Sequence, residues 1–219
     1  MSVFLAIETS SNVPAVALSI DGVVVFNSLS RSDPAPNAEL GAMAAEALRA
    51  GNVTVRDLTA VGVDTGPGGL GAVRGGVAFA NALTYGRGIP VKGFNLFEIV
   101  GRQLAGRADA AVIGAVPAAG ENVYLGLYRN GVVECARFGE PKDIAGSFSD
   151  VAEALVAGRV RAKVAGWLPH CRIQDSEVEA PDPATILAML QDIPVDDLGL
   201  WTLAEPLTDT STFFHLDRS

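Results

Sequence analysis

The amino-acid sequence predicts an α/β protein built from two copies of one strand-strand-strand-helix-strand-helix unit. Residues 3–25 read as strand, polar turn, strand, Asp-Gly and strand, and residues 112–134 repeat this order without a gap. The Asp-Gly at 21–22 and the Asn-Gly at 130–131 occupy equivalent points, and both dipeptides favour two-residue hairpins whose central residues take positive φ. Helix-forming segments are expected after each hairpin, so the similarity extends beyond the strands.

In the first copy, a helix is predicted over residues 39–48, because apolar residues recur there at spacings of three and four. Asn37 is its expected N-cap and Gly51 its expected stop. A strand over 58–64 and a helix over 72–87 complete the unit.

In the second copy, Ser149 or Asp150 is expected to cap a helix over 151–157. A strand over 161–167 and a helix over 184–191 follow in the same order as in the first copy. Two such units imply one mixed sheet in each half, helices on the faces of each sheet, and a cleft between the halves.

The repeat also gives the expected domain boundaries. We expect an N-terminal domain over residues 1–104, a C-terminal domain over 105–205 and a tail over 206–219.

The net charge of −9 is concentrated at the C-terminal end of the chain. Residues 1–174 are balanced, whereas residues 175–219 carry ten acidic side chains and one basic side chain. An acidic end repels phosphate backbones, and no basic stripe elsewhere offsets it. Strong direct binding to nucleic acids is therefore not expected.

No segment of the sequence suits a membrane or an export signal. The longest uncharged runs are about a dozen residues, short of the roughly 18 that a spanning helix needs. The first residues lack the basic region of a secretory signal. Cys135 and Cys171 show no CxxC spacing and are expected to be reduced thiols. We expect a cytoplasmic protein.

Residues 66–71 form a glycine-rich loop that fits G-x-G-x-x-G, follows a predicted strand and opens a predicted helix. A dinucleotide site would also need an acidic residue at the end of the next strand, but that strand, 89–91, leads into Lys92. Ala72 stands where a Walker A loop has its lysine. Two interpretations stay open: a tight turn made by the glycines, or an anion site in which Arg74 assists free helix amides.

Three short motifs occur at or beside predicted strands of the first copy. They are Ile-Glu-Thr-Ser at 7–10, Val-Ala-Leu at 16–18, and Asp-Thr-Gly-Pro-Gly at 64–68 followed by Val73-Arg74 and Gly76. These motifs resemble those of the TsaB (YeaZ-like) family, a bacterial subunit of the machinery that makes threonylcarbamoyladenosine in tRNA. The resemblance implies the duplicated fold of the actin, sugar-kinase and Hsp70-like (RNase H-like) ATPase superfamily, in agreement with the repeat.

The sequence also departs from the family pattern. Gly69 and Gly71 replace a Ser and a Thr of the family loop, Asn37 replaces a His, and Pro117 replaces an Asp before the second hairpin. The chain is therefore identified as a divergent member or a paralogue.

The superfamily's kinases carry a carboxylate at the end of the first strand of each half. Glu8 holds that position in the first half, but Pro117 holds it in the second and has no oxygen to bind Mg²⁺ or accept a proton. Glu8 is expected instead to accept hydrogen bonds from the turn at 9–11. His170 and His215 form no H-x-x-x-H pair, so we expect no catalytic residue, no metal site and no enzymatic activity.

The two helices of the first copy carry more apolar and small residues than one sheet-facing stripe needs. Either the second face packs on the neighbouring domain, or it binds another chain, as these helices do in the TsaB-like family. The resemblance implies a TsaD-like catalytic subunit as partner. It leaves open a TsaE-like ATPase as a further partner and a homodimer when the chain is alone. The predicted interface comprises Leu40, Met43, Ala44, Ala47, Leu48, Gly76, Val77, Ala80, Leu83 and Thr84.

The leading hypothesis is a non-catalytic subunit that supports a TsaD-like enzyme in threonylcarbamoylation of adenosine 37 of tRNA. We expect no strong direct tRNA contact and no cofactor, and weak ATP–Mg²⁺ binding at the complex interface stays open. The alternatives are a paralogue that has lost this role and a nucleotide-dependent small-molecule phosphotransferase. The phosphotransferase would use a candidate anion or nucleotide site formed by Glu8, Thr9, Ser10, Gly66, Gly68, Gly69, Gly71 and Arg74.

Overall fold

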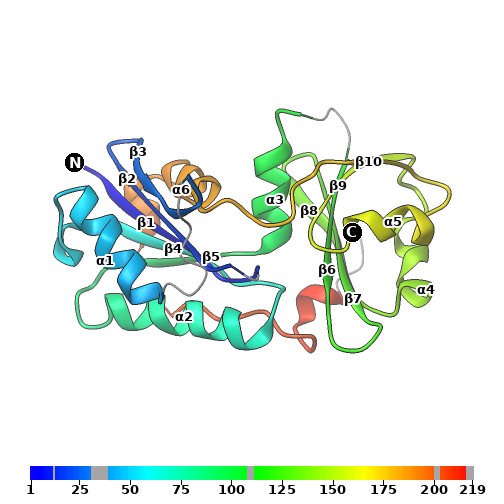
Figure 1. Ribbon diagram of the computed structural model, residues 1–219, viewed down its shortest axis with the longest axis horizontal. Helices are drawn as coiled ribbons and strands as arrows, with labels where there is room; N and C mark the ends of the chain where they lie inside the picture. The colour runs from blue at the N-terminus through cyan, green and yellow to red at the C-terminus, as the bar shows by residue number, and fades with distance from the viewer. Residues whose placement is uncertain (12, 31–38, 108–110, 200–202, 216–219) are drawn as a thin grey trace. The chain divides into compact units, whose positions relative to one another are not determined.

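The computed structural model describes residues 1–11, 13–30, 39–107, 111–199 and 203–215. The chain divides into two compact units (Figure 1). Unit 1 comprises Met1–Phe94 and Asp182–Pro206, and unit 2 comprises Asn95–Pro181 and Leu207–Ser219. Each unit contains one five-stranded mixed sheet. No helix among the described residues is long and apolar enough to cross a bilayer.

The sheet of unit 1 has the strand order β3-β2-β1-β4-β5, with β1 antiparallel to β2 and parallel to β4. The strands are β1 (Val3–Glu8), β2 (Ala15–Ile20), β3 (Val23–Asn27), β4 (Ala60–Asp64) and β5 (Val91–Phe94). The helices of this unit are α1 (Leu40–Ala50), α2 (Leu70–Thr84) and α6 (Pro183–Gln191).

Unit 1 has three layers, with α1 and α2 on one face of the sheet and α6 on the other (Figure 1). Leu5 of β1 shares a core with Met43 of α1 and Val77 of α2. On the opposite face, a Cβ at Gly62 of β4 would overlap Ile186 of α6, so a glycine is needed there for α6 to lie close to the sheet.

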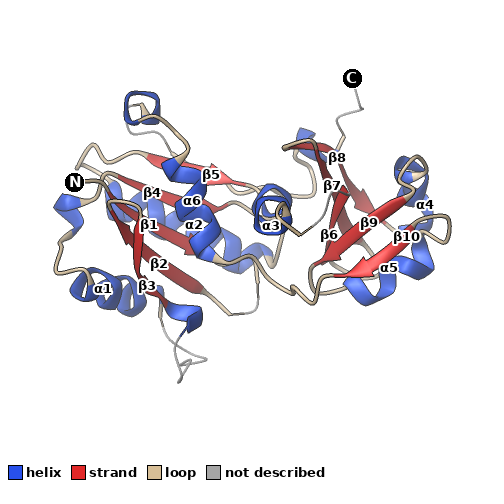
Figure 2. Cartoon of the chain, turned by 90° about the horizontal axis from the view of Figure 1, so that it is seen from above, coloured by secondary structure: helices blue, strands red, loops and turns tan. Residues whose placement is uncertain are grey.

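The sheet of unit 2 repeats this arrangement with the strand order β10-β9-β6-β7-β8. The strands are β6 (Ala111–Pro117), β7 (Val123–Arg129), β8 (Val132–Gly139), β9 (Glu153–Ala157) and β10 (Arg172–Asp175). The helices are α3 (Leu96–Leu104), α4 (Pro141–Ile144) and α5 (Arg161–Trp167). Figure 2 shows α3 on one side of this sheet and α4 and α5 on the other, in agreement with two separate apolar clusters.

The predicted duplication and its hairpins are confirmed. The strands β1 to β3 and β6 to β8 occur in equivalent positions of the two halves. Asp21 and Gly22 have φ of 46° and 83°, and Asn130 and Gly131 have φ of 55° and 84°, as a type I′ hairpin requires. The helix predicted over 39–48 is α1, and Gly51 follows its last residue as the predicted stop; its expected N-cap, Asn37, lies outside the described residues.

Two elements predicted in the second half are wrong. Residues predicted as a helix over 151–157 form strand β9, and residues predicted as a strand over 161–167 form helix α5. Strand β9 lies between two parallel neighbours and is buried almost throughout, so its continuous apolar run has no strand periodicity. In α5, Val164 is buried whereas its neighbours on both sides are exposed, which is the pattern of a surface helix.

The boundaries of the two units differ from those expected, which were between residues 104 and 105 and between residues 205 and 206. Helix α3, which follows β5 in the chain, packs on the sheet of unit 2, and α6, which follows β10, packs on the sheet of unit 1. Residues 206–219 were expected to form a tail, but their described part packs into unit 2. Phe214 is 1% exposed and packs against Tyr124 of β7.

Candidate functional site

Two carboxyl groups meet at one edge of the sheet of unit 1. Strands β1 and β4 are parallel neighbours, so their last residues, Glu8 and Asp64, lie at the same edge. The hydroxyl of Ser10 joins them: its Oγ lies 2.7 Å from Glu8 Oε1 and 2.7 Å from Asp64 Oδ2. Glu8, Ser10 and Asp64 are 1%, 3% and 0% exposed, and together we call them the acid cluster.

The acid cluster needs a shared proton. A serine hydroxyl carries one proton, so Ser10 can donate to only one of its two carboxyl partners and must accept from the other. Glu8 also accepts from the Ser11 amide at 2.9 Å and the Ser11 hydroxyl at 2.6 Å, whereas Asp64 accepts from the Gly66 amide at 2.7 Å. Because more donors surround Glu8, it is better suited to be the ionised partner, and Asp64 to be the neutral acid that donates to Ser10.

The electrostatics of the pair agree with this proton count. Burial, together with the nearby Glu8 charge, raises the pKa of Asp64 to about 8. Burial also raises the pKa of Glu8, while hydrogen bonds from Ser11 and Ser10 act in the opposite direction. One proton is therefore retained by the pair near neutral pH.

The glycine-rich loop is packed tightly against the acid cluster. Gly66 has a φ of 93°, and its peptide bond to Pro67 is cis. A Cβ at Gly68 would overlap the backbone of Ser10, and a Cβ at Gly76 of α2 would overlap the side chain of Thr9. These glycines therefore serve close packing between the turn after β1 and the start of α2.

The structure divides the predicted anion or nucleotide site into a buried part and an exposed part. Glu8, Thr9, Ser10 and Gly66 are buried, Gly68 is half-buried, and Gly69, Gly71 and Arg74 are exposed. The expected hydrogen bonds from the turn to Glu8 are confirmed for Ser10 and Ser11. Glu8 is thus engaged inside the fold rather than presented beside Arg74.

Asp64 was not among the predicted site residues. It is the last residue of a buried strand directly before the glycine-rich loop, and that position resembles the position of Glu8. The position of Asp64 at the end of a buried strand can be seen in the sequence. Its meeting with Glu8 cannot, because that depends on β1 and β4 being parallel neighbours, which no local sequence pattern indicates. In unit 2 the corresponding strand ends carry Pro117 and Ala157.

The predicted partner interface also needs correction. Seven of its ten residues are buried in unit 1 because they form the sheet-facing stripes of α1 and α2: Met43, Ala44, Ala47, Gly76, Val77, Ala80 and Thr84. Leu40, Leu48 and Leu83 are half-buried around the same core. The outward face carries other small residues, which we call the small-residue face: Gly41, Ala42, Ala45, Gly71, Gly75, Ala78 and Ala82. Arg49, Leu70 and Arg74 are exposed on the same two helices beside them.

No group of three or more His, Cys, Asp or Glu side chains is arranged to hold a metal ion in the part of the chain that the structure describes. The acid cluster supplies two carboxyl groups and a hydroxyl, all of them hydrogen-bonded to one another or to the adjacent turns.

Residues 36–162 match a family model described as TsaD: tRNA N6-adenosine threonylcarbamoyltransferase. A tRNA N6-adenosine threonylcarbamoyltransferase from Shouchella clausii is 27% identical over 175 residues, covering 71% of this chain and 52% of the relative. The uncharacterized protein ML0378 from Mycobacterium leprae is 30% identical over 220 residues, covering 95% of this chain and 57% of the relative. The chain spans about half the length of these curated relatives.

Two solved structures from Pseudomonas aeruginosa share the fold. An uncharacterized protein with similarity to peptidase YEAZ superposes with a TM-score of 0.72 at 20% identity, covering 95% of this chain and 99% of the other. YeaZ itself superposes with a TM-score of 0.69 at 19% identity, covering 95% and 100%. The duplicated fold expected from the sequence is confirmed, and it is the fold of these two YeaZ-like structures.

Proposed function

This chain belongs to the family described as TsaD, tRNA N6-adenosine threonylcarbamoyltransferase, and we propose that it is a non-catalytic subunit. It would support a TsaD-like enzyme in the threonylcarbamoylation of adenosine 37 of tRNA. The observation that carries the proposal is the state of the strand ends: the acids of unit 1 are buried in the acid cluster, and those of unit 2 are replaced by Pro117 and Ala157.

A catalytic carboxylate must reach its substrate or a bound metal within hydrogen-bond or ligand distance. Glu8 and Asp64 are 1% and 0% exposed, and their oxygens are occupied by Ser10, Ser11 and Gly66. The same observation weakens the phosphotransferase alternative, because Glu8 was its expected metal or phosphate ligand. Micromolar ATP–Mg²⁺ binding with turnover by the isolated chain would favour that alternative.

The small-residue face supports a partner role. Along α2, Gly71, Gly75, Ala78 and Ala82 recur at spacings of four, three and four, which places them on one outward stripe. Gly41 of α1 lies beside Phe79 of α2, so the two helices present a joint surface. Small side chains allow a second pair of helices to approach closely, and we propose a TsaD-like subunit as the occupant. A second copy of the chain would compete for the same face.

The test replaces Ala78 by Arg. This residue is exposed on α2, so the chain should stay folded while the added side chain blocks helix packing. Co-purification with the TsaD-like enzyme from the same genome should be lost, together with the stimulation of threonylcarbamoyladenosine formation. Ala165→Arg is the matched control, because Ala165 is exposed on α5 in unit 2. Retention of the complex by Ala78→Arg would contradict the proposal.

Ala44→Arg is not suitable for testing partner binding at this face. Ala44 is 2% exposed in the core of unit 1, so a buried guanidinium would unfold the unit and any loss of binding would be indirect.

A further inference from the structure

Unit 2 contains a pocket of about 370 Å³ that the proposed function does not use. Its walls come from the loop between β6 and β7, the start of α4 and one side of α5. Cavities of this size are typical of small-molecule sites that combine apolar walls with a few polar groups.

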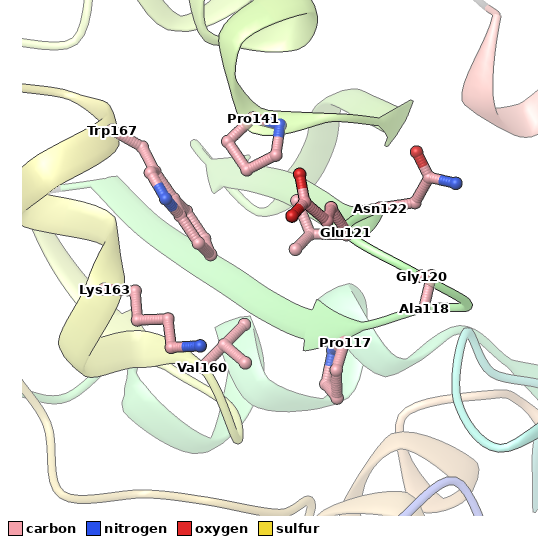
Figure 3. Close-up of a pocket in the computed structure, with 10 residues that line it drawn as sticks. Pro117, Ala118, Gly120, Glu121, Asn122, Pro141, Val160, Lys163 and Trp167 are labelled. Carbon is pink, nitrogen blue, oxygen red and sulfur yellow. The ribbon is translucent and has the colours of Figure 1, made fainter.

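Charged groups of opposite sign stand on facing walls of this pocket. Figure 3 shows Lys163 and Trp167 of α5 on one side, and Glu121 and Asn122 of the loop on the other. Lys163 and Trp167 are four residues apart on the helix and therefore lie on one face of it. Within the described part of the chain, none of these four side chains makes a hydrogen bond or an ion pair.

The remaining lining is apolar. Pro117 at the end of β6, Pro141 at the start of α4 and Val160 before α5 surround the space beside the Trp167 indole. An indole face and branched or cyclic aliphatic groups favour an apolar side chain, most of all an aromatic one that can stack or pack edge-to-face.

We propose that this pocket binds a zwitterionic α-amino acid with an apolar side chain. Its carboxylate would pair with Lys163, its ammonium group with Glu121, and its side chain would lie against Trp167. A nucleotide or another purely anionic ligand would bring its charge toward Glu121, and a cation would meet Lys163, so a ligand with both charges fits the pair best. The proposal concerns unit 2 alone and is independent of the proposed function.

The test measures fluorescence of the full-length chain with L-phenylalanine as the probe. The sequence has two tryptophans, so a Trp201→Phe background leaves Trp167 as the single reporter. For a ligand of this size in an open pocket, the expected Kd is on the order of 1 mM. N-acetyl-L-phenylalanine, which lacks the ammonium group, and L-phenylalaninamide, which lacks the carboxylate, should each bind about fivefold more weakly.

Two variants then assign the charges. Lys163→Gln should weaken L-phenylalanine binding about fivefold without weakening L-phenylalaninamide binding. Glu121→Gln should weaken L-phenylalanine binding without weakening N-acetyl-L-phenylalanine binding. Lys92→Gln, which removes the same charge from β5 of unit 1, should change neither titration. The proposal is overturned if no saturable response occurs up to about 10 mM, if the three ligands bind equally, or if AMP binds more tightly than L-phenylalanine.

Discussion

Replacing Asp64 by Asn tests the proton assignment in the acid cluster. An asparagine has the shape of a neutral aspartic acid, and its amide group can donate to Ser10 Oγ while its oxygen accepts from the Gly66 amide. Ser10 can then donate to Glu8 as before. We therefore expect Asp64→Asn to fold with the same hydrogen-bond pattern and to lose only the titration.

The magnitude follows from the pKa of Asp64 in the two states. The usual value of 3.8 applies to the unfolded chain, and the value in the fold is about 8. Because the folded pKa is the higher one, the folded state binds more protons. The stabilisation contributed by protonated Asp64 is therefore complete below about pH 4 and is lost as the pH rises from about 4 to 8. At about 1.4 kcal/mol per pH unit, the free energy of unfolding should fall by about 3 kcal/mol between pH 5 and pH 7.

The assay is urea unfolding at pH 5, 6 and 7, with the free energy of unfolding compared between wild type and variant. The advantage of Asp64→Asn over wild type should grow by about 3 kcal/mol across this range. Asp57→Asn is the control: hydrogen bonds from Thr54 lower the pKa of Asp57, so its titration lies below this window. Parallel pH profiles for wild type and Asp64→Asn would refute the assignment.

Two further predictions concern packing. Gly68→Ala places a Cβ against the backbone of Ser10 and should lower the free energy of unfolding by about 2 kcal/mol, measured by thermal or urea unfolding. Gly71→Ala is the control: its Cβ meets open space, so the substitution should be neutral or slightly stabilising. Equal effects of the two substitutions would contradict the prediction. Phe214→Ala removes a buried ring from the core of unit 2 and should cost about 3–5 kcal/mol, measured by the same unfolding curves; a cost under about 1 kcal/mol would show that the segment is a loose tail.

The sequence predicted the elements whose signals are local. The hairpins at 21–22 and 130–131 were predictable because their dipeptides accept positive φ, and α1 was predictable because its apolar residues follow the helical period. Strand β9 and helix α5 were not, because a strand buried on both faces has no alternation and α5 has only seven residues.

The remaining failures concern contacts between distant segments. The exchange of α3 and α6 between the two sheets depends on which surface each helix covers, and helix periodicity does not specify that. The same is true of the predicted interface: the apolar residues of α1 and α2 were identified, but the sequence did not show that they face the sheet of unit 1. The meeting of Glu8 and Asp64 required the parallel pairing of β1 with β4, which joins residues more than fifty positions apart.

The acid cluster also connects the chemistry of unit 1 to its proposed surface. It joins the turn after β1 to the loop that begins α2, and α2 carries much of the small-residue face. If the cluster is a structural joint, Asp64→Asn should retain binding of the TsaD-like enzyme and full stimulation of threonylcarbamoyladenosine formation, because its hydrogen bonds are preserved. If Asp64 acts as an acid or base in the reaction, the same variant should remain folded and bound but lose the stimulation. Since the variant is expected to be at least as stable as wild type at pH 7, loss of activity could not be attributed to unfolding, and the two roles are separated by one protein.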